Sequence, residues 1–309
     1  MITAELLERE SCALCRTSHL KILIPTEALP DSVNVLQCID CGLVFLESRA
    51  PEDALDPEEA AYWDSDEQKK IYFKDDVLKT FLKEFEGRLK TLERYVPTRG
   101  RLLDVGCGVG HFLYVARKRG WLVDGLDISP QASRAAKDAY GLGVSVGTLD
   151  ESPFARSTFN AITLWDVIEH IRRPVENVKA MNRLLRMGGV VVMKTPNESG
   201  LFKQLALFLY RCFGRRASFL LKYVYYVPHY FSYSPSTMAA LLTQGGFEVV
   251  ALELDETPQE FATAKIHEHY KVDPKRALVI RLLPLMQWVA RLVRRQNKLV
   301  VYAKKVREA

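Results

Sequence analysis

The chain has 309 residues, of which 48% are hydrophobic and 26% charged, so it can form one large globular domain or two of moderate size. Its net charge of +5 is small, and no uncharged apolar run approaches the ~18 residues of a membrane span. Residues 1–10 hold three glutamates and no apolar core of signal-peptide length. We therefore expect a cytoplasmic protein whose six cysteines are reduced unless they bind metal.

Four cysteines near the start of the chain form two C-x-x-C pairs, Cys12 with Cys15 and Cys38 with Cys41. Four thiolates on two short turns are the ligand set of a tetrahedral structural zinc site, with no coordination position left open for catalysis. We therefore predict a small zinc-ribbon-like domain over residues 1–49, with structural zinc bound by these cysteines. Two redox-active pairs, or a ribbon that holds iron, are the alternatives. Strands of the ribbon are expected at residues 21–24 and 33–37.

Residues 50–69 are acidic and rich in proline and alanine, so they are predicted to form a linker. From residue 70 to residue 95 apolar side chains recur at helical spacing, and Pro97 would end such a helix. We place the start of the main domain, residues 70–309, at this helix.

The sequence Asp104-Val-Gly-Cys-Gly-Val-Gly110 follows an apolar run that is predicted to be a buried strand. Its alternate glycines, Gly106, Gly108 and Gly110, let the backbone approach a ligand closely, with N–H groups at the start of the next helix turned toward it. A second strand is expected to end in Asp127, where a Rossmann-like sheet holds ribose hydroxyls. The dinucleotide pattern G-x-G-x-x-G differs from this sequence, in which Asp104 stands two residues before the first glycine. A carboxylate at this position would repel a diphosphate, so the turn suits a ligand with a cationic end.

Beyond this turn, predicted helices and strands alternate, which is typical of an α/β fold. Helices are expected at residues 130–140 and 174–187. Strands are expected at residues 143–146, 159–165, 190–195, 247–254 and 297–305. Together with the two strands above, they predict a Rossmann-like seven-stranded sheet with helices on both faces, preceded by the small zinc ribbon. The last strand is expected to be antiparallel to the others.

Five segments of the main domain, taken in order, resemble the class I S-adenosylmethionine-dependent methyltransferases and, among them, the ubiquinone-biosynthesis O-methyltransferases. They are the glycine turn above, Gly125-Leu-Asp-Ile-Ser129, Phe159-Asn-Ala-Ile-Thr-Leu-Trp-Asp-Val-Ile-Glu-His170, Leu185-Arg-Met-Gly-Gly-Val-Val-Val-Met193 and Gly246-Phe-Glu-Val-Val250. The resemblance covers roughly residues 70–305 and implies S-adenosylmethionine as the cofactor. It implies cofactor contacts at Asp104, Gly106, Cys107, Gly108, Gly110, Asp127, Ile128, Leu149, Asp150 and Trp165.

In one place the sequence departs from the family's pattern, because Thr148 replaces the acid that commonly follows the third strand. Adenine recognition is therefore expected from the backbone at Leu149 or from Asp150. Cys107, within the glycine turn, is expected to pack beside the cofactor and not to act as a nucleophile.

Methyl transfer from a sulfonium requires the protein to orient the acceptor, exclude water and, for a hydroxyl acceptor, remove a proton. Ligands of such sheets bind at the carboxyl ends of the strands. Glu169 and His170 follow one of these strands, and His229 precedes the helix before the sixth strand. We predict that these three residues are catalytic; in the resembled family the Glu-His pair lies near the acceptor, and a divalent cation is sometimes implicated. The alternative is that His170 only braces its loop.

These features predict an enzyme that methylates a small-molecule or lipid-linked acceptor at oxygen. One alternative is a scaffold that binds the cofactor without turnover, and another is a methyltransferase that acts on protein or RNA. The segment Trp165-Asp-Val-Ile168 stands where N-methylating members have an Asn-Pro-Pro-Tyr type of sequence, which disfavours methylation of base amino groups. The ribbon also lacks a basic face, so no nucleic-acid partner is expected.

Two predicted helical insertions, at about residues 201–230 and 271–296, combine basic and apolar side chains. The first contains no acid, and a helical projection of the second places Gln287 with the arginines and the leucines on the opposite side. In one interpretation the apolar faces pack against each other as a lid over the acceptor site. In the other they form a surface that rests peripherally on the inner face of an anionic membrane.

Overall fold

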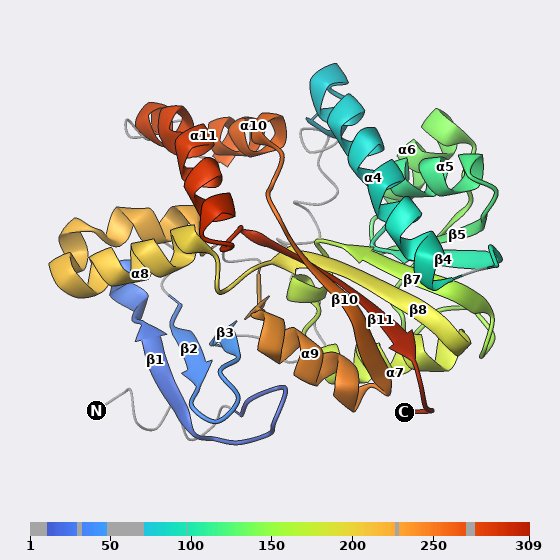
Figure 1. Ribbon diagram of the computed structural model, residues 1–309, viewed down its shortest axis with the longest axis horizontal. Helices are drawn as coiled ribbons and strands as arrows, with labels where there is room; N and C mark the ends of the chain where they lie inside the picture. The colour runs from blue at the N-terminus through green and yellow to red at the C-terminus, as the bar shows by residue number, and fades with distance from the viewer. Residues whose placement is uncertain (1–10, 30–32, 48–70, 97, 226–228, 270–275) are drawn as a thin grey trace.

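The computed structural model of the protein describes residues 11–29, 33–47, 71–96, 98–225, 229–269 and 276–309 (Figure 1). The predicted linker, residues 50–69, lies outside the described residues. The described chain forms a central seven-stranded sheet and a small four-stranded sheet, with helices around them.

The central sheet has the order β10-β11-β8-β7-β4-β5-β6 and confirms the predicted Rossmann-like architecture. Its strands are β4 (Arg101–Val105), β5 (Leu122–Asp127), β6 (Val144–Val146), β7 (Phe159–Trp165), β8 (Leu185–Pro196), β10 (Phe247–Asp255) and β11 (Lys298–Lys305). Strands β4 to β8 pair in parallel, whereas β11 runs antiparallel between β8 and β10. The turns that follow β4, β5, β7 and β8 therefore meet at one edge of the sheet, where ligands of such folds bind.

Helices cover both faces of the central sheet, because parallel strands of this kind are buried on both sides. In Figure 1, α4 (Asp75–Tyr95), α5 (His111–Lys118) and α6 (Pro130–Tyr140) lie above the sheet, and α7 (Pro174–Leu184) and α9 (Pro235–Gln244) lie below it. Alternate residues of β8 divide between the two faces. Val190 and Val192 pack in the core that contains α4 and α5, and Val191 and Met193 pack in the core that contains α7 and α9.

The N-terminal segment that carries the cysteine pairs supplies three strands of a second sheet of order β1-β2-β3-β9, in which all neighbours are antiparallel. Its strands are β1 (Leu20–Ile24), β2 (Val35–Cys38), β3 (Val44–Leu46) and β9 (Phe231–Ser232). The sequence predicted β1 and β2 approximately but neither β3 nor β9, because strands of three and two residues produce no periodic pattern. A strand from the predicted main domain thus completes the sheet of the predicted ribbon.

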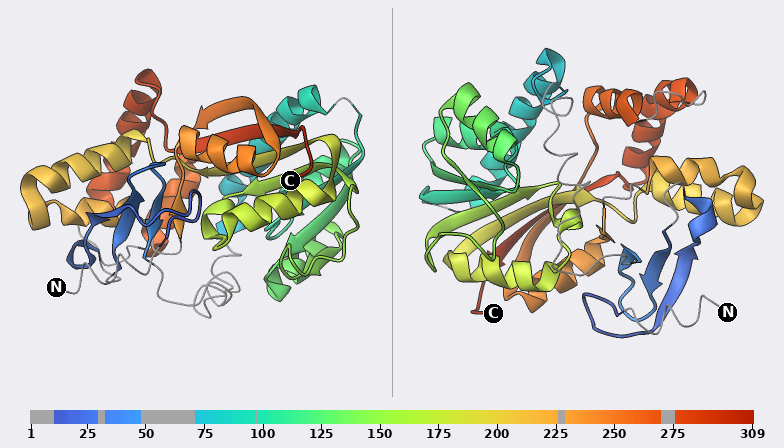
Figure 2. Two further views of the ribbon diagram at one scale, coloured as in Figure 1. Left: turned by 90° about the horizontal axis from the view of Figure 1, so that it is seen from below. Right: turned by 180° about the vertical axis from the view of Figure 1, so that it is seen from behind.

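The helical insertions and the small sheet lie at the end of the molecule away from α5 and α6 (Figure 2). The first insertion consists of α8 (Leu201–Phe213) and the 3-10 turns η3 (Gly214–Arg216) and η4 (Ser218–Tyr223). The second consists of α10 (Gln259–His269) and α11 (Arg276–Leu292), so it begins before the predicted residue 271. No helix among the described residues is both long enough and apolar enough to cross a membrane.

The helix predicted at residues 174–187 ends earlier than expected. Helix α7 ends at Leu184, and β8 begins at the next residue. Leu185 pairs with Phe159 of β7, and both side chains are fully buried. Burial in the sheet therefore outweighs the good helix propensity of Leu-Arg-Met at this point.

Candidate active site

A cavity of about 880 Å³ opens at the carboxyl ends of β4, β5, β7 and β8. Most of the predicted site residues line it. These are Asp104, Gly106, Cys107, Gly108, Asp127, Ile128, Leu149, Asp150, Trp165, His170 and His229. Gly110 and Glu169 were predicted with them but are not part of the lining. Each is the direct sequence neighbour of a residue that does line the cavity.

The glycine turn after β4 has three left-handed residues, Gly106, Gly108 and Gly110, with φ of +66°, +52° and +83°. A Cβ atom on Gly106 would lie 2.4 Å from a methyl carbon of Val167, so no side chain fits there. Gly110 is the N-cap of α5, and a Cβ atom on it would lie 2.8 Å from a methyl carbon of Leu142. Gly110 therefore serves the close packing of α5, whereas Gly106 and Gly108 border the cavity.

Asp127, at the end of β5, is held by two backbone donors. Its Oδ2 accepts a hydrogen bond from Gly108 N at 2.7 Å, and its Oδ1 accepts one from Ser129 N at 2.9 Å. Burial raises the pKa of Asp127 above its usual value, and the hydrogen bonds from these two N–H groups oppose part of that rise. The carboxylate is thus fixed between two turns, and its remaining lone pairs can accept hydrogen bonds from a ligand in the cavity.

Asp104 lies almost fully buried at the start of the same turn and accepts a hydrogen bond of 2.6 Å from Thr163 Oγ1. Burial raises the pKa of Asp104 well above its usual range, and the charge of Asp127 raises it further. A ligand with a cationic group would favour the charged form of this carboxyl. Burial also raises the pKa of the Cys107 thiol well above its usual range, which suits a packing residue and not a thiolate nucleophile.

The residues predicted to contact adenine lie on the segment after β6. Leu149 is buried, whereas Asp150 is exposed and its Oδ2 accepts a hydrogen bond of 3.2 Å from Arg173. This ion pair links the segment to the start of α7. Ile128, which follows β5, also borders the cavity. The roles of these residues toward a cofactor stay predictions.

An aromatic wall of the cavity was not predicted from the sequence. Tyr72 stacks on Phe81 of α4 with ring centroids 5.8 Å apart, and Phe261 of α10 lies 5.7 Å from Tyr72. Trp165, predicted as a cofactor contact, packs 5.4 Å from Phe85. Helical spacing could not reveal this wall, because aromatic residues that face a cavity and those that face the core follow the same period.

Two lysines that line the cavity were also missed, Lys194 of β8 and Lys298 of β11. Lys298 Nζ lies 2.5 Å from Asp166 Oδ1, and Lys194 pairs with Glu84 of α4. Burial alone would raise the pKa of Asp166, but the charges of Lys298 and Lys194 hold this pKa below its usual value. The available sequence signal was a lysine that directly follows the apolar run 190–193, because a buried strand rarely holds a lysine without a partner.

The predicted catalytic residues Glu169, His170 and His229 come together at this end of the cavity. The rings of His170 and His229 lie 4.8 Å apart in an edge-to-face arrangement. Burial lowers the pKa of His229 well below its usual value, so the ring is neutral near pH 7 and can accept a proton. Glu169 is fully buried, its Oε2 accepts a hydrogen bond of 2.9 Å from Thr195 Oγ1, and burial raises its pKa.

Glu169, His170 and His229 each offer a ligand atom within 4.8 Å of the others, and a carboxylate with two imidazoles can hold a transition metal. However, the charges of Lys298 and Lys203 also lower the pKa of His229, and the same charges oppose a cation at this position. The cluster therefore offers ligand atoms for a metal ion as well as a ring that can accept a proton, and the same positive charges oppose both.

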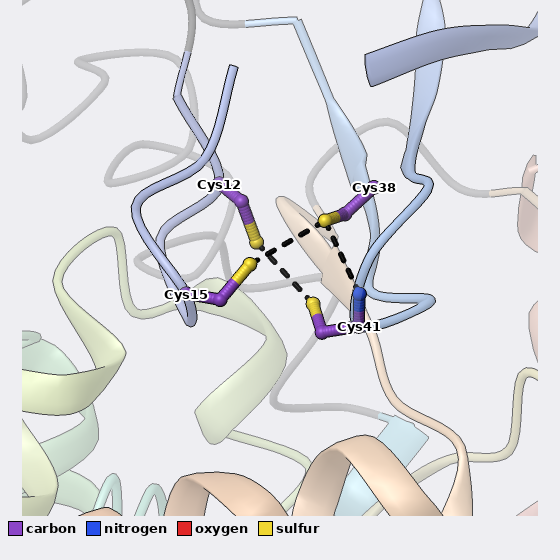
Figure 3. A group of neighbouring side chains, drawn as sticks. All are labelled: Cys12, Cys15, Cys38 and Cys41. Atoms are coloured by element: carbon purple, nitrogen blue, oxygen red, sulfur yellow. Dashed lines mark hydrogen bonds between the residues drawn. The ribbon is translucent and has the colours of Figure 1, made fainter. Parts of the chain in front are cut away.

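The four N-terminal cysteines converge on one point (Figure 3). Their Sγ atoms all lie within 4.8 Å of one another, and Cys12 to Cys41 and Cys15 to Cys38 are both 3.5 Å. Sulfurs that lie about 2.3 Å from a tetrahedral zinc ion are roughly 3.8 Å apart, so this spacing fits the metal. Cys41 N also donates to Cys38 Sγ at 3.4 Å.

Residues 72–252 match the family model described as a methyltransferase domain, which is more than half of the 309 residues. The chain belongs to this methyltransferase family. The ubiquinone biosynthesis O-methyltransferase of Paracidovorax citrulli is 32% identical to this methyltransferase over 123 residues, which are 36% of the chain and 50% of the relative. That of Methylococcus capsulatus is 28% identical over 188 residues, 54% of the chain and 76% of the relative.

The methyltransferase chain thus spans about half the length of the first of these relatives. Among solved structures, magnesium protoporphyrin IX methyltransferase from Synechocystis PCC 6803 with bound SAH superposes with a TM-score of 0.53 at 13% identity, over 80% of this chain and 98% of that one. At this identity the likeness shows the fold alone.

Proposed function

We propose that this protein binds S-adenosylmethionine in the cavity and transfers its methyl group to an oxygen atom of a small-molecule or lipid-linked acceptor. The observation that carries the proposal is the carboxylate of Asp127, fixed by Gly108 and Ser129 beside the glycine turn, where it can accept hydrogen bonds from ribose hydroxyls. The buried Asp104 suits the cationic end of this cofactor. Oxygen as the acceptor atom is supported by the relatives, which are named as O-methyltransferases.

The bound cofactor would supply an electrophilic methyl group. The residues of the chain then have to hold the acceptor, exclude water and take up the proton of its hydroxyl. We assign the proton uptake to His229, whose ring is neutral near pH 7, with His170 against it. Glu169, held by Thr195, would stabilise the positive charge that forms on the imidazole pair.

Titration calorimetry with S-adenosylmethionine and S-adenosylhomocysteine tests the first part of the proposal, and one site per chain is expected. Incubation with methyl-labelled S-adenosylmethionine and a panel of phenols, with and without prenyl chains, tests the second. A protein that binds neither cofactor form contradicts the proposal. Binding with label transferred only to protein or RNA, or to no acceptor, favours one of the two alternatives instead.

Replacing Asp127 with Ala should weaken S-adenosylmethionine binding about tenfold or more. The change removes an acceptor of charge-assisted hydrogen bonds, each worth about 1.5–3 kcal/mol. Asp124→Ala is the matched control, because Asp124 lies on the same strand but pairs with Arg101 outside the cavity lining. Calorimetry should show unchanged affinity for the control, and unchanged affinity for Asp127→Ala would refute the assignment.

We further propose that Cys12, Cys15, Cys38 and Cys41 bind one structural zinc ion. Elemental analysis should find about one zinc per chain, and Cys38→Ser should release it. Cofactor binding should survive this change, because none of the described residues up to 47 lines the cavity. Cys212→Ser, at an exposed cysteine of α8, should keep the metal. Metal-free protein with four freely titrating thiols would contradict the assignment.

We also propose that α8 and α11 rest on an anionic membrane surface. Apolar residues of α11 recur every three or four positions on its outer side, which makes one exposed stripe. They are Leu278, Leu282, Leu285, Trp288 and Leu292. Trp288 and Leu292 are 58% and 63% exposed, and α8 adds Phe208 at 61% and Phe213 at 60%. So much exposed apolar surface on two neighbouring segments calls for a partner.

The projection that grouped Gln287 with the arginines on one side of the helix was wrong. Gln287 is buried, its Nε2 donates to Thr257 O at 2.9 Å, and it lines the cavity with Leu283. Leu282, Leu285 and Leu292 of α11 are exposed and not buried against α8 as the lid interpretation expects, although α11 does border the cavity. Exposed arginines, Arg281, Arg291, Arg294 and Arg295, flank the apolar stripe. This combination is typical of a helix that lies in the headgroup region of a membrane.

A further inference from the structure

The small sheet reaches the cavity through β9. Strand β3 pairs with β9 through Val44 with Ser232 and Phe45 with Phe231, and Leu46 N donates to Tyr230 O at 2.9 Å. His229 and Tyr230, the two residues directly before β9, both line the cavity. The hydrogen bond from Leu46 N, at the end of β3, is therefore accepted by Tyr230, a residue of the cavity lining.

The position of β3 depends on the second cysteine knuckle. Cys38 N donates to Leu43 O at 2.9 Å, and Gly42 N donates to Cys38 O at 3.1 Å. These bonds close a tight turn that contains Cys41 and leads directly into β3. A metal ion held by the four sulfurs would fix this turn and, with it, the register of β3.

The other side of β9 is attached to the central sheet. Tyr233 forms an isolated parallel bridge with Asn197, and Glu198 N donates to Tyr233 O at 2.8 Å. The segment that carries His229 and Tyr230 is thus anchored after β9 by the end of β8, and along β9 by the ribbon. The glycine turn and Asp127, in contrast, have no hydrogen bond with the described residues of the ribbon.

We propose that the four-cysteine ribbon is a positioning element for the acceptor half of the site: its metal holds β3, β3 holds β9, and β9 sets the place of His229 and Tyr230. This inference rests on the proposed function, which supplies the zinc and the catalytic role of His229. The cavity then has two halves, a cofactor half built by the central sheet and an acceptor half that depends on the ribbon.

Hydrogen exchange measured by mass spectrometry on the full chain tests the inference. In Cys38→Ser, exchange in peptides that cover residues 44–46 and 229–233 should become about tenfold faster or more, whereas the affinity for S-adenosylhomocysteine stays within about twofold. Leu46→Pro removes the N–H that reaches Tyr230 O, so it should speed exchange at 229–233 while keeping the metal. Cys38→His, which restores a zinc ligand, should recover both metal and protection.

Acceptor kinetics give a second readout once a substrate is in hand. Both Cys38→Ser and Leu46→Pro should raise KM for the acceptor or lower kcat, with KM for S-adenosylmethionine unchanged.

Unchanged exchange at 229–233 in a Cys38→Ser protein that has lost its metal overturns the inference alone. Failure of the wild-type protein to bind S-adenosylhomocysteine contradicts the proposed function. A wild-type protein that contains no metal contradicts the zinc assignment and this inference together.

Discussion

Changing Arg291, Arg294 and Arg295 together to Glu should reduce binding to anionic vesicles about a hundredfold or more. Each basic residue near an anionic surface contributes about 1 kcal/mol, so three of them contribute about 3 kcal/mol. Three new negative charges add repulsion to this loss. The side chains are exposed at the end of α11 and beyond it, and none of the three lines the cofactor cavity.

Co-sedimentation with neutral and with anionic vesicles, at several salt concentrations, measures the effect. Changing Lys118, Arg134 and Lys137 to Glu matches the charge change at exposed positions of α5 and α6, at the other end of the molecule, and should have little effect. Added salt should weaken wild-type binding, because it screens exposed charges.

The apolar part of the surface has its own test. The emission of Trp288 should shift to the blue with anionic vesicles, and Trp288→Ser should weaken binding several-fold, since a tryptophan side chain would enter the headgroup region. Wild-type protein that binds neither type of vesicle contradicts the membrane proposal. So does a triple variant that binds anionic vesicles as well as wild type does.

Much of the central sheet could be predicted because its information is local. Strand β7 was predicted at its observed bounds, and β11 to within one residue, since each is a short apolar run between turn residues. The glycine turn and Asp127 were equally accessible, because three alternate glycines after a strand require a tight turn wherever they occur. Because the turn follows the carboxyl end of a strand in a parallel sheet, it was expected to border a ligand cavity.

The rest depends on contacts between segments that are far apart in the chain. Nothing in the sequence of β9 indicates that Phe231 pairs with Phe45, and nothing in Asp166 indicates that Lys298 is its partner. An amphipathic pattern such as that of α11 shows which residues share a face but not whether the face meets protein, lipid or water. Gln287 illustrates this, since it is buried and donates a hydrogen bond to Thr257 O although the projection grouped it with the arginines.

His229→Ala should lower the rate of methyl transfer by about two to four orders of magnitude, the usual contribution of a general base, and leave the affinity for S-adenosylmethionine unchanged. His19→Ala is the control, because His19 is exposed on the ribbon and pairs with Asp40. His170→Ala should have a smaller effect if His170 only orients its neighbour, whose ring centroid lies 4.8 Å away. Single-turnover measurement with labelled cofactor separates these rates from binding.

The pH dependence gives an independent check on the same residue. A general base works only when it is unprotonated, and burial holds the pKa of His229 well below its usual value. The wild-type rate should therefore stay level as the pH falls from about 8 to about 6.5, and decline only when the pH passes through the lowered pKa. A decline centred near pH 6.5 or above would point to a group other than His229. A level profile with an unimpaired His229→Ala variant would remove the histidine from the mechanism, because another group would then take the proton.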